Sequence, residues 1–431
     1  SGANTHSGTL AITDGTLVLS GTLNDSQAVT VSSGAEFNTS DHETIGSIEG
    51  DGTIDVEHKT ILTVGGDNTS TTFSGVIQSN GAGVGTGGIV KQGTGTLTLS
   101  GNNTFSGAVT VSAGTLAIGS NNALGDNGNQ TNISSGATLD FQDVTYSTTE
   151  SVISNSGIIS ASTGTSSFAG TISLNGNTDI DVDGTQLTLS GVISGSNALT
   201  KTGNGIAILS GNNNYTGNTI ISEGTLRVSG SLTSSTNLSI SSGATYDVDA
   251  TDTIGSISGT AGTIDIASST TLTTSSSSNT SFGGVIQGSG GLNKSGTGTL
   301  TISGTNTYSG ITTINGGRLT VTGTLSDSSA VNIGSSGTYD VDASDTVASI
   351  EGSGTIDIAS SQTLTAGDSN NKTFGGTITG SGSFVKNGNG ALTLNGNSSF
   401  SGGATLNSGT TILGHNNALG SGNLTLAGGS L

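Results

Sequence analysis

The sequence predicts an all-β protein whose chain winds into a stack of short coils, a parallel β-helix. Leu, Ile and Val alternate with Thr and Ser in short runs such as Thr96-Leu97-Thr98-Leu99. This two-residue period places one side of a strand inside the molecule and the other outside. Gly, Asn-Gly and Ser-Gly turns separate the runs, and no long stretch keeps apolar residues at helical spacing. A long internal repeat is the third observation.

A phrase made of a Lys, a Gly-rich turn, an apolar strand and an aromatic residue recurs along the chain. The aromatic residue follows the Lys by 14 positions in every copy. The pairs are Lys91 with Phe105, Lys201 with Tyr215, Lys294 with Tyr308, and Lys386 with Phe400. Repetition at a fixed period is typical of solenoids, in which each repeat packs on its neighbours.

The chain is predicted to be a single elongated segment, residues 1–431, that is divided into long repeats. The Lys residues are 93 positions apart from Lys201 to Lys294 and 92 apart from Lys294 to Lys386. The interval from Lys91 to Lys201 is 110 positions, because residues 120–185 diverge from the pattern. The expected long repeats are 14–92, 93–200 (divergent), 201–295, 296–387 and a partial copy, 388–431.

Composition favours a narrow core over a sandwich or a barrel. The chain contains 74 Gly and no Pro, and its aromatic residues are nine Phe and five Tyr. Stacked coils need only small aliphatic residues and an occasional ring at a corner, and like residues then stack in ladders. Coils of about 20 to 25 residues would give a solenoid of roughly 18 to 20 rungs.

The recurring phrase resembles the autotransporter-associated β-strand repeat of bacterial type V passenger domains. It has the form Gly-x-x-Lys-x-Gly-x-Gly-x-Leu-x-Leu-Ser-Gly-x-Asn-x-Tyr/Phe-Ser/Thr-Gly, and Asn122-Ala123-Leu124-Gly125 and Asn417-Ala418-Leu419-Gly420 match the family's usual continuation. The resemblance implies a right-handed parallel β-helix that is anchored at the surface of a Gram-negative cell by its own C-terminal translocator barrel, or is secreted. We expect this chain to be a segment without that barrel and without a signal peptide.

The charge balance argues against several classes of partner. The net charge is −21, and the eight Lys and Arg residues do not cluster. Nucleic acid and anionic lipid are therefore not expected partners. No apolar stretch approaches the length that spans a bilayer, so membrane insertion of this segment is not expected. The absence of Cys fits export of an unfolded chain, although a Cys-free cytosolic repeat protein is also ordinary.

The recurring Lys and aromatic residues each have two interpretations. The Lys residues could form a comb of ligand contacts, but a solvated Lys at a strand start, which discourages edge pairing, is the preferred interpretation. The aromatic residues could form a platform for sugar stacking, but a packed corner of the coil is preferred.

Acidic residues that alternate along strands are weak candidates for a calcium site. They are Asp179, Asp181 and Asp183 in one strand, Asp247 and Asp249 in a second, and Asp340 and Asp342 in a third. Carboxylates that point outward in a file can bind Ca²⁺. The preferred interpretation is solvation, with pairing to Arg227 or Arg318 on a nearby rung. No cofactor is expected.

An enzyme is not expected, and no residue is predicted to be catalytic. A β-helix enzyme that acts on polysaccharides needs carboxylates clustered with a basic residue. Two sets could qualify: Asp247, Asp249 and Asp252 with Arg227, and Asp340, Asp342 and Asp345 with Arg318. Their duplication argues against a single active site. Neither the tripeptide Gly367-Asp368-Ser369 nor the scattered His6, His42, His58 and His415 lies in a recognisable triad or metal motif.

The predicted function is a surface-exposed adhesin or autoaggregation segment that binds through many weak polar contacts along the rod. Its partner would be a host-cell receptor or glycan, or the same protein on another bacterial cell. The alternative is a passive β-helical stalk that displays an N-terminal effector, because binding residues usually lie on inserted loops. A polysaccharide-acting enzyme and an ice-binding rod are minor alternatives. A specific site is expected in Gly81–Thr86, in residues 120–185 or on the acidic strands.

Overall fold

A computed structural model describes residues 4–79, 87–126 and 130–431, and these residues form β-strands joined by turns, with no helix among them. The Gly-rich residues 81–86, where a specific site was expected, lie outside the described residues. Neighbouring strands pair in parallel and build a β-solenoid of about 20 turns. The predicted all-β solenoid and its number of rungs are confirmed, and its right-handed sense stays a prediction. Within the described ranges, nothing has the length and apolar character of a membrane-crossing helix.

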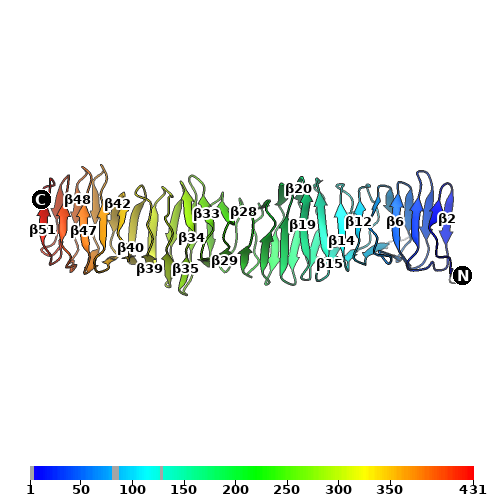
Figure 1. Cartoon of the computed structure of the whole chain (residues 1–431), viewed down its shortest axis with the longest axis horizontal. Helices are drawn as coiled ribbons and strands as arrows, with labels where there is room; N and C mark the ends of the chain where they lie inside the picture. Colours follow the sequence, from blue (N-terminus) through cyan, green and yellow to red (C-terminus); the bar gives the residue numbers. More distant parts are fainter. Residues whose placement is uncertain (1–3, 80–86, 127–129) are drawn as a thin grey trace. The chain divides into compact units, whose positions relative to one another are not determined.

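The chain divides into two compact units, Ser1–Asn218 and Thr219–Leu431. In both units the strands follow one another as stacked coils (Figure 1). A coil carries up to three strands, each hydrogen-bonded to the equivalent strand of the coil before it and the coil after it. Each row of paired strands therefore forms one face of the solenoid.

The strands of residues 1–218 form four rows. The longest row is β1 (Leu10–Ile12), β3 (Ala28–Val31), β6 (Ser47–Gly50), β9 (Thr71–Phe73), β12 (Thr96–Leu99), β14 (Thr115–Ile118), β16 (Thr138–Gln142), β19 (Ile158–Thr163), β22 (Thr178–Val182) and β25 (Leu199–Thr202). The second is β5 (Glu43–Ile45), β8 (Ile61–Val64), β11 (Gly88–Lys91), β13 (Val109–Val111), β15 (Gln130–Ile133), β18 (Ser151–Ser154), β21 (Thr171–Leu174) and β24 (Ile193–Gly195). Two shorter rows are β2 (Thr16–Leu19), β4 (Glu36–Thr39), β7 (Thr53–Val56) and β10 (Val76–Gln78), and β17 (Thr145–Tyr146), β20 (Thr165–Phe168), β23 (Gln186–Leu189) and β26 (Ile206–Leu209).

Residues 219–431 repeat this arrangement. One row is β31 (Asp252–Ile254), β34 (Thr271–Thr274), β37 (Gly291–Lys294), β39 (Thr312–Val321), β40 (Ala330–Val341), β42 (Ser349–Gly352), β45 (Lys372–Phe374), β48 (Leu392–Leu394) and β50 (Thr411–Leu413). The long β39 and β40 turn a corner, so that β39 also pairs with β38 (Thr299–Ile302) and β40 with β43 (Thr355–Ile358). Beyond them, β38 pairs with β35 (Thr280–Phe282) and β43 with β46 (Thr377–Gly380). The other rows are β41 (Asp345–Val347), β44 (Thr363–Ala366), β47 (Ser383–Lys386), β49 (Ala404–Leu406) and β51 (Leu424–Leu426); β27 (Thr219–Ile221), β29 (Asn237–Ile240) and β32 (Ser256–Ser258); and β28 (Thr225–Val228), β30 (Thr245–Val248), β33 (Thr263–Ile266) and β36 (Val285–Gly288).

The core is a set of ladders in which apolar side chains stack from coil to coil. Paired residues are about 20 positions apart, as Leu187 is from Ala207. In one ladder Phe73 pairs with Leu99, Leu99 with Ile118, and Ile118 with Phe141. These four side chains are at most 1% exposed. Alternation along each strand therefore supplies both the buried ladder and the polar outer surface.

The long repeat and the coil have different periods, so equivalent residues of successive repeats lie on different faces. In residues 1–218, Lys91 ends β11 and Lys201 lies in β25, which belong to different rows. In residues 219–431, Lys294 ends β37 and Lys386 ends β47, again in different rows. A repeat of 92 residues, from Lys294 to Lys386, is not a whole number of coils of about 20.

Adjacent coils approach each other closely at a column of Gly residues. A Cβ atom added to Gly304 would lie 1.9 Å from the carbonyl oxygen of Gly284, and one added to Gly284 would lie 2.2 Å from that of Gly262. Only Gly allows the backbones to come this close. The Ser-Gly turns of the recurring phrase therefore set the stacking distance at this corner.

We predict that Gly304→Ala destabilises the protein by on the order of 2 kcal/mol, because the new methyl group must push two coils apart. Calorimetry would give the change in thermal stability, and hydrogen exchange should show the loss of protection around β36 and β38. Gly375→Ala is the matched control, since its Cβ would meet nothing closer than 3.4 Å. Equal stability of the two variants would contradict the prediction.

Candidate functional site

The repeated aromatic residues are buried and offer no platform to a ligand. The positions are Phe37, Phe73, Phe105, Phe168, Tyr215, Tyr246, Phe282, Tyr308, Tyr339, Phe374 and Phe400, each at most 1% exposed. The packed-corner interpretation is confirmed. In the divergent residues 120–185, Phe168 also packs on Phe141 and Tyr146, with ring centroids 5.2 and 5.7 Å apart.

The four recurring Lys residues are at most 2% exposed, so the prediction that they are solvated is wrong. The Nζ atom of Lys91 lies 2.8 Å from the carbonyl oxygen of Gln92, 3.1 Å from that of Gly93 and 3.2 Å from that of Ala113. The last residue belongs to the turn one coil further on. Lys386 makes the same three contacts with Asn387, Gly388 and Ser408. The ammonium group therefore closes its own Gly-rich turn and ties it to the next one.

These Lys residues are held by carbonyl oxygens inside the solenoid. Burial lowers the pKa of Lys91 to about 8 and also lowers the pKa of Lys294 and of Lys386. An ammonium group has three N–H donors, one for each of the three carbonyl groups in the turns that it contacts. The Lys of the phrase is thus a structural clamp.

The Asn of the recurring phrase replaces a missing strand. Between β38 and β39 the chain passes one face of the coil without forming a strand, and there Oδ1 of Asn306 accepts the N–H of Ile286 at 2.9 Å. Asn103 does the same for Ile77 at 2.8 Å. Since a buried N–H without a partner is costly, the Asn side chain supplies the acceptor that the absent strand cannot.

A carboxylate that the sequence did not predict to be buried recurs at one position in each full long repeat. The residues are Glu43, Glu150, Asp252 and Asp345, each at most 5% exposed. Asp345 accepts the N–H of Leu325 at 3.1 Å and the hydroxyl of Tyr339 at 2.5 Å. Asp252 is bonded in the same way to Leu232 and Tyr246. Each of these residues stands two positions before a buried aliphatic residue, which was the signal that they point inward.

Burial raises the pKa of these carboxyl groups. The pKa of Asp345 is raised to about 6 and that of Glu150 to about 7, while hydrogen bonds to Tyr339 and to Thr131 oppose the shift. The pKa of Glu43 and that of Asp252 are raised by the same cause. Near neutral pH the interior therefore contains carboxyl groups that are close to protonation.

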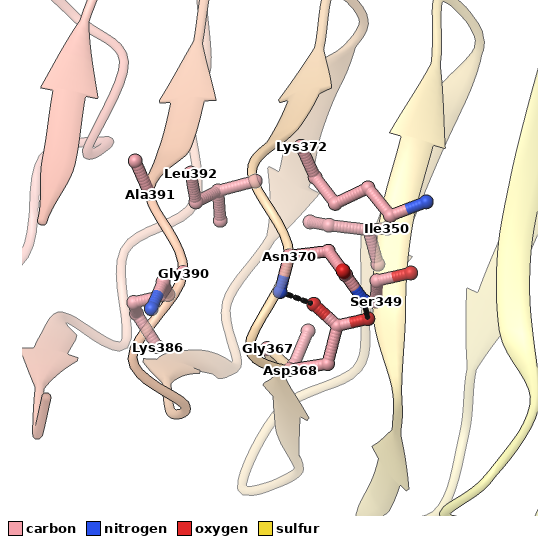
Figure 2. Close-up of a pocket in the computed structure, with 11 residues that line it drawn as sticks. Ser349, Ile350, Gly367, Asp368, Asn370, Lys372, Lys386, Gly390, Ala391 and Leu392 are labelled. Atoms are coloured by element: carbon pink, nitrogen blue, oxygen red, sulfur yellow. Dashed lines mark hydrogen bonds between the residues drawn. The ribbon is translucent and has the colours of Figure 1, made fainter. Parts of the chain in front are cut away.

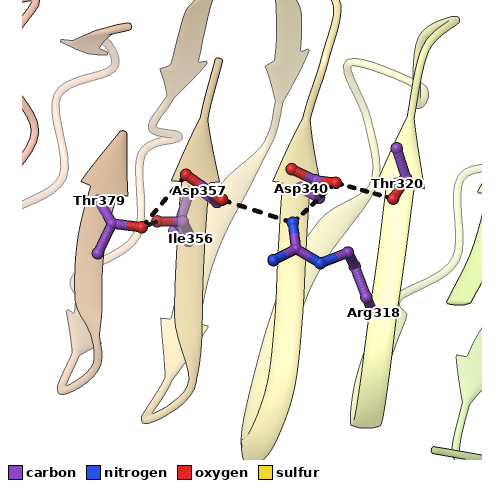
Figure 3. Close-up of polar contacts among 6 residues, drawn as sticks. All are labelled: Arg318, Thr320, Asp340, Ile356, Asp357 and Thr379. Carbon is purple, nitrogen blue, oxygen red and sulfur yellow. Dashed lines mark hydrogen bonds and ion pairs between the residues drawn. The ribbon is translucent and has the colours of Figure 1, made fainter. Parts of the chain in front are cut away.

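The Asp side chains of the acidic strands lie on the outer side of the solenoid. On two of these strands they form ion pairs with Arg residues, as predicted. Nε of Arg227 lies 2.7 Å from Oδ2 of Asp247 and 3.5 Å from Oδ2 of Asp249. Figure 3 shows the second pairing, in which Nη1 of Arg318 lies 2.8 Å from Oδ2 of Asp340 and 3.4 Å from Oδ2 of Asp357.

Thr side chains extend this second row of polar contacts. Thr320 donates to Asp340 and Thr379 donates to Asp357, on neighbouring strands. The row links β39, β40, β43 and β46 across the outer surface. In residues 1–218, Asp181 accepts a hydrogen bond from Thr202.

The carboxylate sets that were considered for catalysis are separated by the wall of the solenoid. Asp247 and Asp249 lie on the outside with Arg227, whereas Asp252 is buried and binds backbone groups; Asp340 and Asp345 are separated in the same way. Within residues 4–79, 87–126 and 130–431, no three His, Cys, Asp or Glu side chains are grouped to hold a metal ion. Binding of Ca²⁺ by the seven acidic residues stays the weak alternative to solvation.

Two of the four His residues, and the Asp of the Gly367-Asp368-Ser369 tripeptide, accept hydrogen bonds from backbone N–H groups. Nδ1 of His42 accepts the N–H of Ile61, and Nδ1 of His415 accepts that of Asn417. Asp368 accepts hydrogen bonds from the backbone and the side chain of Asn370 (Figure 2). Beside this turn a void of about 10 Å³ lies among Ser349, Ala366 and Leu392, which is too small for more than about one water molecule.

Five segments of the chain match one family of repeats. The Passenger-associated-transport-repeat family matches residues 1–19, 89–118, 199–228, 292–321 and 384–413. Four of these ranges contain the recurring Lys. The fifth, residues 1–19, has no such Lys and corresponds to the later part of the phrase. There Asn4 and His6 stand where Asn103 and Phe105 stand in a full copy.

A curated relative points to the same class of protein. The adhesin BmaC autotransporter of Brucella suis biovar 1 (strain 1330) is 36% identical over 171 residues, which cover 38% of this chain and 4% of the relative. No solved structure matches the chain. The repeats and this relative support an autotransporter passenger segment that is surface-displayed or secreted by a Gram-negative bacterium.

We predict that Lys386→Met destabilises the protein by about 2 kcal/mol or more, because the carbonyl groups of Asn387, Gly388 and Ser408 lose their donor inside the molecule. Lys372→Met is the control, since that Lys forms a partly exposed ion pair worth about 0 to 1 kcal/mol. Urea unfolding followed by circular dichroism would measure both. A larger effect at Lys372 than at Lys386 would contradict the structural role.

We also predict that the free energy of unfolding falls as the pH rises from about 4 to about 7. The pKa of Asp345 and of Glu150 is higher in the folded state, about 6 and about 7. Over this window the unfolded chain therefore loses its protons before the folded chain does. Asp345→Asn should reduce the fall in the free energy of unfolding between about pH 4 and about pH 7 by on the order of 2 kcal/mol. Asp51→Asn, at an exposed position, should leave the dependence of the unfolding free energy on pH unchanged. If Asp345→Asn also left it unchanged, the assignment of Asp345 as a buried group with a raised pKa would be refuted.

Proposed function

We propose that this chain is an adhesive segment of the passenger, which mediates attachment to host cells or contact between bacterial cells. The observation that carries the proposal is the outer surface, where Thr, Ser, Asn and Asp alternate with the buried residues along the strands. Pairs such as Thr72 with Thr98 and Thr110 with Asn132 continue this polar surface from one coil to the next. The relative named as an adhesin supports the same function.

Such a surface would bind by multivalency. One hydroxyl or carboxamide group contributes little, since it exchanges a hydrogen bond with water for one with a ligand. Many equivalent groups at a fixed coil spacing can engage a repeating partner together, and their contributions then combine. The partner would be a receptor or a glycan on a host cell, or a second passenger on another bacterium.

A passive stalk is the second candidate, and a specific observation favours it. The residues that recur in the phrase, namely the Lys, the Asn and the aromatic residue, are all buried, and the Lys and the Asn bridge adjacent coils. The repeat thus encodes the solenoid itself, and a spacer needs nothing more.

Bacteria that display the full-length protein should attach to host cells or aggregate at least about tenfold more than bacteria that display the protein without residues 1–431. An epitope tag outside the deletion would verify equal display of the two proteins. Unchanged attachment and aggregation at equal display would rule out the adhesive role and support the stalk.

A further inference from the structure

On one face of residues 1–218, two neighbouring strands separate and leave a polar hollow. Strands β6 and β9 pair only at Gly50 and Phe73. Beside this pair the surface has a hollow of about 560 Å³ that is open to solvent. Its lining consists of Gly50 and of residues that bring hydroxyl groups and one carboxylate, namely Thr30, Glu49, Ser70, Thr71, Thr72, Thr96 and Thr98. Glu49 is exposed, so the hollow presents one negative charge among neutral hydroxyl groups.

The same separation of strands occurs in residues 219–431. Strands β42 and β45 pair only at Gly352 and Phe374. The paired registers show which residues correspond: Glu351 to Glu49, Lys372 to Thr71, Thr373 to Thr72, and Thr393 to Thr98. The two sites thus have the same backbone arrangement and an equivalent carboxylate. They differ at one position, where the second site has Lys372 and the first has Thr71.

The second site shows what this geometry accommodates. Nζ of Lys372 lies 3.3 Å from Oε2 of Glu351, and the two side chains are 26% and 31% exposed. Figure 2 shows the Lys372 side chain extending from its own strand toward the strand of Ser349 and Ile350. The Lys stem thus spans the gap between the separated strands and brings its ammonium group to the carboxylate.

At the first site this ammonium group is missing. Thr71 is too short to reach across, and Oε1 of Glu49 accepts a hydrogen bond from the hydroxyl of Thr30 at 2.8 Å. Among the described residues, Glu49 has no ion-pair partner of the kind that Lys372 gives Glu351. The hollow therefore has the shape and the charge for a flexible cationic chain that the protein does not supply there.

We infer that the hollow at Glu49 binds the side chain of a Lys residue from a basic partner protein, in the way that Lys372 lies against Glu351. The ammonium group would donate to Glu49 and to the surrounding hydroxyl groups, which satisfies its three donors. The methylene stem would lie over Thr71 and Thr72. This inference rests on the proposed adhesive function and specifies the chemistry of one partner.

Charge indicates that the Lys comes from a different protein. The chain has a net charge of −21 and only eight Lys and Arg residues. Four of these Lys residues are buried, and Lys372, Arg227 and Arg318 form ion pairs within the chain. A second copy would thus repel the first and would have little more than Lys59 to offer. A basic partner is attracted by the whole acidic surface, and the hollow fixes where one of its Lys residues binds.

The experiment is saturation-transfer NMR on the 431-residue chain with Nα-acetyl-lysine N-methylamide as the probe. The wild-type protein should saturate the probe. Glu49→Gln and Thr71→Lys should each lower the signal at least about fivefold, the first by removing the charge and the second by filling the hollow from within. Lys372→Thr should raise the signal, because it opens a second hollow at Glu351. Circular dichroism would verify that the variants remain folded.

Three outcomes would overturn the inference. The first is an unchanged signal in both Glu49→Gln and Thr71→Lys. The second is equal saturation of the neutral probe Nα-acetyl-norleucine N-methylamide, which would show that the ammonium group is not recognised. The third is stronger competition by glucosamine than by a Lys-containing peptide, which would assign the site to an amino sugar. Because the probe binds the isolated chain, a negative result here is distinguishable from a loss of cell attachment.

Discussion

Backbone hydrogen bonding between adjacent coils is the interaction on which the structure depends. Each coil offers its N–H and C=O groups to the coils on either side, at a strand spacing of about 4.8 Å, so each face of a coil must either form a strand or provide a substitute. Most faces form strands. Where the recurring phrase passes a face without a strand, Asn306 and its equivalents accept the N–H that would otherwise be unpaired. Where a Gly-rich turn leaves carbonyl groups over, Lys91 and its equivalents supply the donors.

Alternation along the strands allowed much of this fold to be predicted from the sequence. Apolar residues at every second position marked the strands, and the fixed place of Phe105 and its equivalents marked buried corners. The outward Asp247 and Asp340 were expected to pair with Arg227 and Arg318, and they do. The strands, the buried aromatic corners and the outward Asp residues all follow from the preference of a side chain for water or for the core, which can be judged one residue at a time.

Buried charges were the part that the sequence analysis missed, because a charge beside a Gly turn normally faces water. Lys386 stands two positions after the buried Phe384, and Asp345 stands two positions before the buried Val347. The alternation of buried and exposed residues along the strand therefore places both side chains inward, although charged groups prefer water. Only the neighbouring coil shows why burial is tolerated, since the partners of Lys386 and Asp345 include Ser408 and Leu325, about 20 residues away in the sequence. Such partners depend on coil length, which a pattern within one strand does not reveal.

The mismatch between the long repeat and the coil has a consequence for how such a protein can change over generations. A recombination event that adds or removes one unit of 92 residues alters the length of the solenoid and also turns every later side chain to another face. Because inward and outward residues alternate on the same strands, the inner ladders and the outer rows share one register at the junction. Copy number therefore sets both the length of the solenoid and the face on which each later residue lies.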